Sequence, residues 1–498
     1  MPDQFTERLQ LFSSSDNINR LNRLQRGIEK ESLRVGLDGK LAQTPHPKSL
    51  GSALTHPHIT TDFSEALLEF ITPVSTDIEE SLQTLDNIHR FTYQQLDGEL
   101  LWAASMPCIL EGDENIPVAQ YGSSNVAKMK TAYRQGLGNR YGRLMQTISG
   151  IHYNFSLPDD LWEIMQQQDY DKRPLKDYVT DSYFKLIRNF RRYSWLLVYL
   201  YGASPAVCKS FLREREDHQL QDFDQGSVYL PYCTALRMGD LGYQSNAQES
   251  LNICYNSIDN YVDTLRQAII NPHSDYEKLG VNVDGEYQQL SSALLQIENE
   301  FYSPIRPKRV TQSGETPIGA LKNLGVEYIE VRCIDVNPYL PLGIDADQIR
   351  FIDCFLMYCL FERSPMCDDD ERARIGSNLK SVVNRGREPG LKLTSREGDI
   401  TLPEWGNSLM DGIDKIAVQL DKAHGGHDYQ RVCNQQREKL ADPSLTPSAK
   451  ILAAMTEQEK PFFSLAMKWS TQHKDEFESR PLTGDDLANF QRYSKQSI

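Results

Sequence analysis

Alternation of apolar and polar residues marks several segments in the first two thirds of the chain. It is clearest between residues 144 and 156, where apolar residues stand at every second position from Ile151 and His152 lies on the polar face. A period of two predicts a strand with one buried and one solvated face. Residues 295–302 and 326–335 alternate in the same way, so we expect strands there too.

Several of these expected strands carry acidic residues on their polar faces. The strand over residues 295–302 would place Glu298, Glu300 and Tyr302 on one face. The strand over residues 326–335 would place Glu330 and Arg332 on one face, with apolar residues opposite. Strands of this kind are typical of an antiparallel sheet with one wet, concave side.

A further strand-like stretch, residues 27–35, reads Gly-Ile-Glu-Lys-Glu-Ser-Leu-Arg-Val. In a strand, Glu29, Glu31 and Leu33 would point to the same side. Two neighbouring carboxylates repel each other unless water or cations separate them. A solvated outer face explains one such pair as well as a functional site does, so the pair gains meaning only from similar residues elsewhere.

Other segments show the three- to four-residue spacing of amphipathic helices. We expect one helix over about residues 78–96, with Thr76 and Glu79 forming its capping box. Residues 181–202 predict a buried, aromatic-rich helix. Pro73 is expected to end the element that precedes the first of these helices.

From Asp345 onward the pattern is mainly helical, and Thr446 followed by proline predicts another helix start. The turn-rich stretch 338–347 is the one plausible boundary, and apolar residues run straight up to it. We therefore predict an α+β fold. Its two parts are a catalytic α+β domain over residues 15–345 and a mainly helical region over residues 346–498 that packs on it.

The composition excludes some classes of function. The 498 residues are 39% hydrophobic and 24% charged, which is typical of a globular protein and gives enough chain for a large core. A net charge of −16 argues against a general nucleic-acid or anionic-membrane binder, because such a protein needs basic surface. A small phosphorylated ligand in a locally basic or metal-filled pocket remains compatible with it.

The cellular location of the protein is predicted from the lack of a recognisable signal peptide and of a membrane-spanning segment in the sequence. Residues 1–26 have no apolar signal-peptide core, and the apolar run 195–205 is too short to cross a bilayer. We therefore expect a cytoplasmic protein. The nine cysteines show neither C-x-x-C spacing nor zinc-like pairing with histidine, which favours reduced, mostly buried thiols.

Acidic side chains recur in or beside apolar stretches, where an unpaired carboxylate would be costly to bury. Each of these residues taken alone is more readily explained as a solvated or paired side chain. Together they form a set of hard oxygen ligands with one imidazole, which suits Mg²⁺ or Mn²⁺ better than zinc or copper. The set comprises Glu29, Glu31, Asp62, Glu65, Glu69, His152, Glu298, Glu300 and Glu330.

Basic residues that could meet a phosphoryl group accompany this set. Arg332 shares a strand face with Glu330, and residues 302–309 hold three basic side chains and two prolines. No P-loop, dinucleotide-binding or protein-kinase motif is present. The residues therefore indicate a metal-dependent enzyme able to accept a nucleoside triphosphate, and they name no substrate.

At these residues the chain closely resembles the bacterial glutamate–cysteine ligases, from about Arg26 to Asp345 and more weakly through the helical tail. So many long matches in the same order are highly specific. The segments that carry the resemblance are residues 26–34, 60–73, 133–141, 145–156, 229–232, Arg237 with 241–243, 296–309 and 326–332.

The resemblance implies ATP-dependent joining of the glutamate γ-carboxylate to the cysteine amine through a γ-glutamyl phosphate, the first step of glutathione synthesis. It implies a fold related to glutamine synthetase, in which curved antiparallel strands form an open barrel lined by metal ligands. Mg²⁺ is the expected cofactor, with Mn²⁺ as a substitute, and ATP is a substrate. Feedback inhibition by glutathione and a monomeric state are expected as well.

Site residues are also implied by the resemblance. The positions matching Mg²⁺ ligands around the triphosphate are Glu29, Glu31, Glu69, His152 and Glu330. Arg332 matches a residue near the transferred phosphoryl group, and with Glu330 it is the expected catalytic pair. The positions matching the cysteine pocket are Tyr133, Arg237, Tyr243 and Tyr302.

Some alternatives stay open beside this interpretation. The chain ends without a second ATP-binding module, so we expect the monofunctional type of ligase. Cys233 and Cys333 lie inside matching segments, where they are core thiols or make activity sensitive to oxidation. A ligase for another acceptor amine, a non-catalytic regulatory subunit, and a metal-dependent phosphatase or nuclease are the rival functions.

Overall fold

The computed structural model describes residues 3–213, 218–242, 251, 253–312 and 314–498. An antiparallel sheet of seven strands lies at its centre, in the order β11-β12-β5-β1-β3-β2, with β4 paired to the far end of β1. Within the described residues this sheet is open, since β11 and β2 form its edges. Its strands are β1 (Gln25–Gly36), β2 (Ile59–Thr61), β3 (Leu67–Ile71), β4 (Glu99–Leu101), β5 (Gly150–Ser156), β11 (Ile305–Lys308) and β12 (Tyr328–Asp335).

Strand β1 is the longest of these and pairs with three partners. Its first half pairs with β5, which sets Glu29 directly opposite His152. Its middle pairs with β3, which sets Glu31 opposite Glu69. Because strand side chains alternate, the odd-numbered acidic residues of β1 share one face while Ile28 lies on the other. The pairing thus brings three carboxylates and one imidazole together from three strands.

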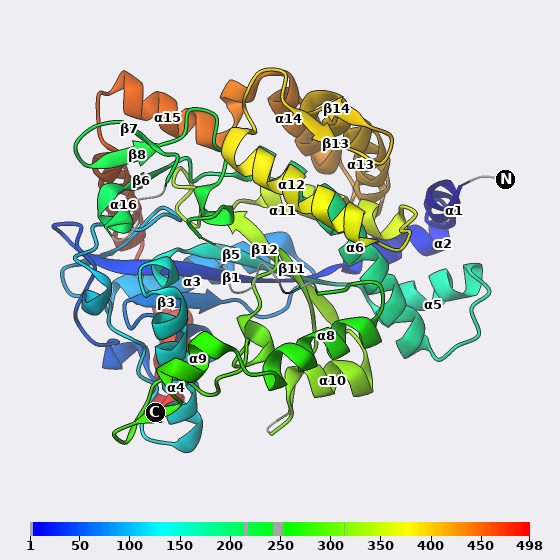
Figure 1. Ribbon diagram of the computed structural model, residues 1–498. Coiled ribbons are helices and arrows are strands. Elements are labelled where there is room, and N and C mark those ends of the chain that lie inside the picture. The colour runs from blue at the N-terminus through cyan, green and yellow to red at the C-terminus, as the bar shows by residue number, and fades with distance from the viewer. Residues whose placement is uncertain (1–2, 214–217, 243–250, 252, 313) are drawn as a thin grey trace.

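The opposite face of the sheet is mainly apolar and packs against helices. Ile28, Phe70, Tyr153 and Val331 are all essentially unexposed and belong to one continuous core with residues of α3, α6 and α11. In Figure 1, α11 and α12 lie above the sheet, and α4, α8 and α10 lie below it. One face is therefore sealed by helices, and the other faces a space bounded by α4.

Helices make up most of the remaining chain. Those before residue 345 are α1 (Gln4–Leu11), α2 (Ser15–Ile18), α3 (Ile78–Tyr93), α4 (Asn125–Tyr141), α5 (Asp159–Gln168), α6 (Leu175–Tyr201), α8 (Ile258–Ile270), α9 (Ser274–Leu279) and α10 (Pro317–Leu324). Those after it are α11 (Ala346–Phe361), α12 (Asp369–Arg385), α13 (Leu402–His424), α14 (Asp428–Ala441), α15 (Pro447–Glu457), α16 (Phe462–Ser479) and α17 (Gly484–Ser497).

Short strands complete the structure away from the central sheet. They are β6 (Ala206–Cys208), β7 (Gln221–Asp222) and β8 (Ser227–Tyr229) in one small sheet, and the hairpins β9 (Asn282–Val283) with β10 (Glu286–Tyr287) and β13 (Lys392–Thr394) with β14 (Asp399–Thr401). The predicted α+β class, with an open antiparallel sheet and a helical C-terminal region, is confirmed. The predicted division at residue 345 stays a prediction.

Most strands and helices predicted from periodicity are present. The strand at 27–35 is β1, that at 144–156 is β5 from Gly150 onward, and that at 326–335 is β12. The aromatic-rich helix is α6, and Thr446 caps α15 by accepting a hydrogen bond from the backbone N–H of Ala449. No described helix is long and apolar enough to cross a membrane.

Two local predictions are wrong. Residues 295–302 form no strand; they contain a 3₁₀ turn at Glu298–Glu300. The carboxylates of this turn bond to backbone N–H groups, that of Glu300 to Gln296 (2.6 Å) and that of Glu298 to Ile318 (2.9 Å), and such bonds compete with a strand ladder. The N-cap of α3 is Asp77 and not Thr76, because the Asp77 carboxylate accepts from two backbone N–H groups of the first turn.

Candidate functional site

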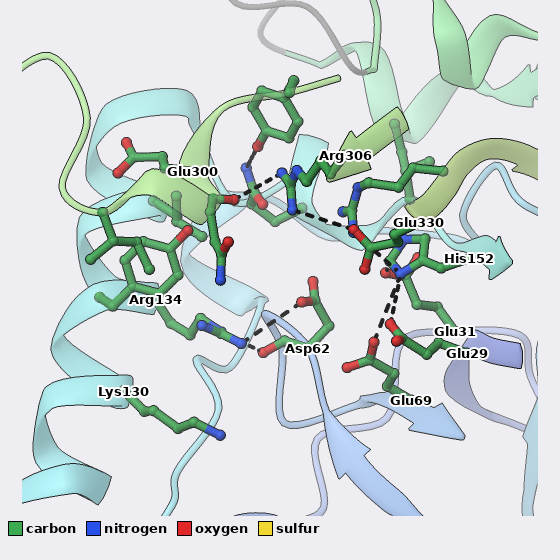
Figure 2. A pocket seen from close by; sticks show the side chains of 18 of the residues that line it. Glu29, Glu31, Asp62, Glu69, Lys130, Arg134, His152, Glu300, Arg306 and Glu330 are labelled. Atoms are coloured by element: carbon green, nitrogen blue, oxygen red, sulfur yellow. Dashed lines mark hydrogen bonds and ion pairs between the residues drawn. The ribbon is translucent and has the colours of Figure 1, made fainter. Parts of the chain in front are cut away.

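A cavity of about 380 Å³ lies between the polar face of the sheet and helix α4. Figure 2 shows carboxylates from β1 and β3 turned toward His152, with Arg134 and Lys130 of α4 across the space. The residues of the sheet that line it are Glu29, Glu31, Glu69, His152, Arg306, Lys308, Glu330 and Arg332. Those of α4 and the loops include Asp62, Lys130, Tyr133, Arg134, Leu137, Gln146, Asn299, Glu300 and Tyr302.

His152, Glu29, Glu31 and Glu69 form the acidic half of the cavity, and His152 lies at its centre. Its Nδ1 lies 3.1 Å from Glu29 Oε2 and 4.0 Å from Glu69 Oε1, and its Nε2 lies 3.6 Å from Glu31 Oε1. The second oxygen of each β1 carboxylate is held by β5: Asn154 Nδ2 donates to Glu29 (2.8 Å), and the Gly150 N–H donates to Glu31 (2.6 Å). The carboxylates are thus oriented from the neighbouring strand before any ligand arrives.

Repulsion between these carboxylates appears in their pKa values. Burial raises the pKa of Glu69 well above its ordinary range, and the negative charges of Glu29 and Asp62 raise it further. Burial also raises the pKa of Glu31. For Glu29 burial acts in the same direction, but the hydrogen bond to the His152 ring, together with nearby positive charge, outweighs it and lowers the pKa. The acidic half therefore favours positive charge, supplied by protons or by a cation.

Glu330 lies between the acidic half of the cavity and its basic half, which Arg306, Lys308 and Arg332 form. Its carboxylate lies 3.2 Å from Arg332 Nη1, 3.4 Å from Lys308 Nζ and 3.9 Å from Arg306 Nη1. Although burial raises its pKa, Lys308 and Arg332 hold that pKa well below the ordinary value. Arg332 Nη1 also lies 3.3 Å from His152 Nδ1, so one guanidinium spans both halves. The pairing of β12 with β5 shifts register between Val331 and Ile334, an irregularity of the kind that re-aims side chains beside sites.

The donor set fits a divalent cation with a preference for oxygen ligands. Ligand atoms of Glu31, Glu69 and His152 lie within 4.8 Å of one another, and so do those of Glu29, His152 and Glu330. His152 Nε2 is buried and has no hydrogen-bond partner in the described part of the chain. When Nδ1–H donates to Glu29, Nε2 presents a lone pair toward Glu31, and a cation between them would satisfy both. Carboxylate oxygens with one imidazole suit Mg²⁺ or Mn²⁺.

The far wall combines aromatic and cationic side chains. Gln146 Nε2 donates to the Tyr302 hydroxyl (2.9 Å), and Tyr133 lines the same cavity. The Arg134 guanidinium lies over the Tyr133 ring, 5.0 Å from its centroid, and 3.8 Å from Asp62 Oδ1. This end offers a small substrate a surface of aromatic rings with a few polar groups. Its cations face the acidic half across the cavity.

Some lining residues of the cavity were not predicted from the sequence, among them two cations and one amide. Lys130, Arg134 and Gln146 line the cavity, yet neither the acidic set nor the family resemblance assigned them a role. Lys130 and Arg134 are four positions apart, so the helical spacing of α4 could have placed them on one face. Burial lowers the pKa of Lys130, as expected for a cation facing a partly enclosed space.

Not every residue predicted for the site lines the cavity. Arg237 is unexposed: its guanidinium lies 3.7 Å from Asp335 Oδ1 and donates to the backbone carbonyl of Arg332 (2.8 Å). It also packs on Gly150 so closely that a Cβ there would come within 1.9 Å of Nη2. Arg237 thus underlies the strands of the site, and its predicted contact with cysteine stays a prediction. Tyr243 lies outside the described residues.

Three members of the acidic set have structural partners, and one of them is Glu300, whose carboxylate lies 3.1 Å from Arg140 Nη1 and accepts a hydrogen bond from the Tyr141 hydroxyl (2.7 Å). The Glu65 carboxylate accepts hydrogen bonds from the backbone N–H groups of His46 (2.9 Å) and Gln120 (2.7 Å). The Glu298 carboxylate holds the first turn of α10. For these three residues the interpretation as paired side chains applies. Asp62 lines the cavity but belongs to neither cluster of ligand atoms.

A second cavity of about 310 Å³ opens from the basic edge of the first. The two share Asn299, Arg306 and Lys308 as lining residues. Apolar and aromatic side chains from α8, α10 and β12 form one part of the wall of the second cavity, among them Tyr261, Leu265, Ile318, Leu321 and Tyr328, and polar residues that include Glu298 and Arg309 form the rest. A long ligand could therefore lie with a ring here and its anionic end among the cations and carboxylates.

All nine cysteines are free thiols in the structure. Cys233 and Cys333 are buried, and burial raises the pKa of both, that of Cys333 to about 12. A buried thiol with a raised pKa is a poor nucleophile and oxidises slowly. Their environment favours the role of core residues.

Known proteins resemble the chain along its length. The family model for glutamate–cysteine ligase matches residues 9–382. The glutamate–cysteine ligase of Pseudomonas paraeruginosa is 50% identical over 498 residues, covering 100% of this chain and 94% of the relative. That of Azotobacter vinelandii is 49% identical over 501 residues, covering 100% of this chain and 94% of the relative.

Solved structures resemble it as well. The crystal structure of the glutamate–cysteine ligase of Francisella tularensis in complex with AMP superposes with a TM-score of 0.89 at 37% identity, covering 96% of this chain and 93% of that one. A bifunctional glutathione synthetase from Pasteurella multocida superposes with a TM-score of 0.78 at 25% identity. It covers 99% of this chain, which spans 58% of that longer protein.

Proposed function

The chain belongs to the glutamate–cysteine ligase family, and from this premise we propose that ATP, glutamate and cysteine meet in the acidic cavity beside β1. The protein is an ATP-dependent ligase that joins the glutamate γ-carboxylate to the cysteine amine and begins glutathione synthesis. The observation that carries the placement is the pair of carboxylate–imidazole clusters beside Arg332. No other cavity of the described residues holds such a cluster.

ATP would lie across both cavities. The second cavity offers a ring-sized space between Tyr328, Ile318 and Leu321, which suits the adenine base. The triphosphate would then run past Arg306 and Lys308 into the acidic half, since both residues border both cavities. These cations neutralise phosphate oxygens by charge-assisted hydrogen bonds.

Glu29, Glu31, Glu69, His152 and Glu330 would hold Mg²⁺, with Mn²⁺ as a substitute. Bound there, Mg²⁺ supplies charge neutralisation for the triphosphate of ATP. The chain's own part is to orient: Asn154 and the Gly150 N–H fix the two β1 carboxylates, and Arg332 lies where the transferred phosphoryl group would arrive. Glu330 holds Arg332 in place through the ion pair between them.

The proposed reaction proceeds in two steps. The glutamate γ-carboxylate oxygen attacks the terminal phosphorus of ATP, the bond to the ADP oxygen breaks, and γ-glutamyl phosphate forms. The cysteine amine, as the free base, then attacks the acyl carbon, and phosphate leaves with the electrons of its C–O bond. The amine's extra proton passes to solvent or phosphate. Arg332, preorganised beside the reacting atoms, stabilises the charge that develops on the phosphoryl oxygens.

Cysteine would occupy the aromatic end of the cavity. Tyr133 and Tyr302 provide surface for its side chain, and Gln146 fixes the Tyr302 hydroxyl. The assignments of Arg237 and Tyr243 to this pocket rest on the family resemblance alone. Glutathione, which contains the γ-glutamylcysteine unit, would compete for the same space, so feedback inhibition belongs to the proposal. So do a monomeric state and a cytoplasmic location.

One assay tests the proposal. ADP release is measured with ATP, Mg²⁺ and glutamate, with and without cysteine, and the product is identified by mass. Cysteine should stimulate ADP release and give γ-glutamylcysteine. Replacement of cysteine by alanine or by ammonium separates the rival acceptor amines, because a ligase for another amine would prefer one of them. Absence of stimulation by cysteine would refute the substrate assignment.

A further inference from the structure

The helix-covered face of the sheet contains a buried ion pair directly behind the acidic cavity. Arg26 of β1 and Asp353 of α11 both have side chains with 0% exposure, and their N–O distance is 2.6 Å. Both residues lie outside every set that the family resemblance assigns to the site. A buried ion pair contributes little net stability, because desolvation offsets its attraction. Its presence in a packed core therefore asks for another explanation.

The pair is the centre of a network that joins three elements. Arg26 donates to Asp353 Oδ2 from Nε (2.8 Å) and Nη2 (2.6 Å), while the Tyr153 hydroxyl of β5 donates to Oδ1 (2.7 Å). Arg26 Nη1 donates to the backbone carbonyls of Leu24 (2.9 Å) and Thr76 (2.7 Å). One carboxylate on α11 thus fixes a side chain from β1 and a side chain from β5.

These two strands carry the acidic cavity on their other face. Arg26 is three residues before Glu29, and Tyr153 follows His152 directly. The pairing of β1 with β5 places Glu29 opposite His152, so any displacement of one strand against the other changes the geometry of that pair. A slip of one residue would turn Glu29 and Glu31 toward the core.

The apolar side chains around the ion pair do not fix the position of β1 along β5. Ile28, Ile151 and Phe155, which share the face with Arg26 and Tyr153, are unexposed, and apolar contacts tolerate small sliding movements. Hydrogen bonds to one carboxylate do not tolerate such sliding, because they weaken steeply as the angle and the distance change. Ligand groups of a metal site must be held to within about 0.5 Å.

We propose that Asp353 is a positioning residue for the cation site, acting from the helical C-terminal region through Arg26 and Tyr153 on strands β1 and β5. This inference rests on the proposed cation site. Its consequence is that affinity for a divalent cation depends on a carboxylate that never touches the cavity, on the far side of the sheet.

The decisive variant removes the network without leaving a buried charge. In the triple variant R26M/D353L/Y153F, apolar side chains of similar size replace all three partners, so the fold is expected to persist. Mn²⁺ binding is measured by electron paramagnetic resonance, without nucleotide, and urea unfolding is measured in EDTA. We expect Mn²⁺ affinity to fall by about 10- to 100-fold, as when groups that orient metal ligands are lost, with the unfolding midpoint close to that of the unmodified protein.

A control ion pair is available between two helices away from the central sheet. Arg192 of α6 and Glu371 of α12 form another buried ion pair, 2.9 Å apart, whose partners lie outside the central sheet. The variant R192M/E371L should leave Mn²⁺ affinity unchanged. An equal loss of affinity in this control would overturn the proposal, because the effect would then be general to core ion pairs.

Two further outcomes keep the test sharp. Unchanged Mn²⁺ affinity in the folded triple variant refutes the positioning role, whereas failure of the unmodified protein to bind Mn²⁺ refutes the cation site itself. Should the triple variant not fold, Tyr153→Phe carries the test, since it leaves the ion pair intact and removes only the β5 hydrogen bond. It should weaken Mn²⁺ binding several-fold, and unchanged binding would refute the proposal.

Discussion

Glu69→Gln is expected to stabilise the metal-free protein while it inactivates the enzyme. Ligand atoms of Glu31 and Glu69 lie within 4.8 Å of each other. At an effective dielectric constant of about 20, two unit charges at that separation repel by about 3 kcal/mol. Proton uptake relieves part of this repulsion. A glutamine at this position has the same shape and no charge, so it should stabilise the metal-free fold at pH 8 by about 1–3 kcal/mol.

The pH dependence fixes the sign of this effect. Burial raises the pKa of Glu69 in the folded protein, so the folded state binds more protons than the unfolded state above the ordinary glutamate pKa. Stability therefore falls as the pH rises through the raised pKa, and the destabilisation is largest at alkaline pH. In Glu69→Gln this part of the pH dependence should disappear, so the difference between variant and unmodified protein should grow from pH 5 to pH 8.

The assay is urea unfolding in EDTA at both pH values, followed by tryptophan fluorescence. Glu99→Gln is the matched control, because Glu99 is buried and its carboxylate pairs with Arg34 at 2.8 Å. That substitution removes an attraction and should destabilise the fold at both pH values. If Glu69→Gln also destabilised the metal-free protein at pH 8, the account of the cavity as a self-repelling cluster would be wrong. Turnover with ATP and Mg²⁺ should fall at least about 100-fold in Glu69→Gln and serves as the functional readout.

Four further substitutions test separate parts of the site. Glu29→Gln and Glu330→Gln should each lose most turnover in a protein that still folds, and full turnover in both would remove them from the cation site. Tyr302→Phe deletes the hydroxyl that Gln146 holds, a loss of about 1 kcal/mol, so the KM for cysteine should rise about fivefold while the KM for ATP stays constant. Ile318→Trp fills the second cavity and should raise the KM for ATP alone; an unchanged KM would place the adenine base elsewhere.

Alternation predicted the acidic wall because the strands that carry it have one face in the core. In β5 the core face is Ile151, Tyr153 and Phe155, so the polar positions between them are unambiguous, and the predicted strand is present from Gly150 onward. Residues 295–302 show the same alternation, yet their carboxylates bond to backbone groups and the chain turns. Period alone does not distinguish these cases, because the competing partner of Glu298 lies in α10, twenty residues later in the chain.

The other half of the site depended on tertiary contacts that leave no local pattern. Lys130 and Arg134 face the carboxylates only because α4 crosses in front of the sheet, and the spacing within α4 says nothing about that crossing. Asp353 lies in an apolar helical stripe, where a single carboxylate gives no sign of its partner. That partner, Arg26, is more than three hundred residues away in the sequence.

The two halves together are consistent with the proposed binding of a triphosphate by an acidic protein. Six acidic and five basic side chains line the cavity, so its local charge is nearly balanced although the chain carries −16. The charges are separated in space: the carboxylates of β1 and β3 surround His152, and the cations come from α4, β11 and β12. A magnesium-bound triphosphate has the complementary pattern, with a cation on one side and phosphate oxygens on the other. A purely acidic pocket would match only the cation, and a purely basic pocket would match only the phosphate oxygens. The family's reaction requires contacts of both kinds at the same phosphorus atom.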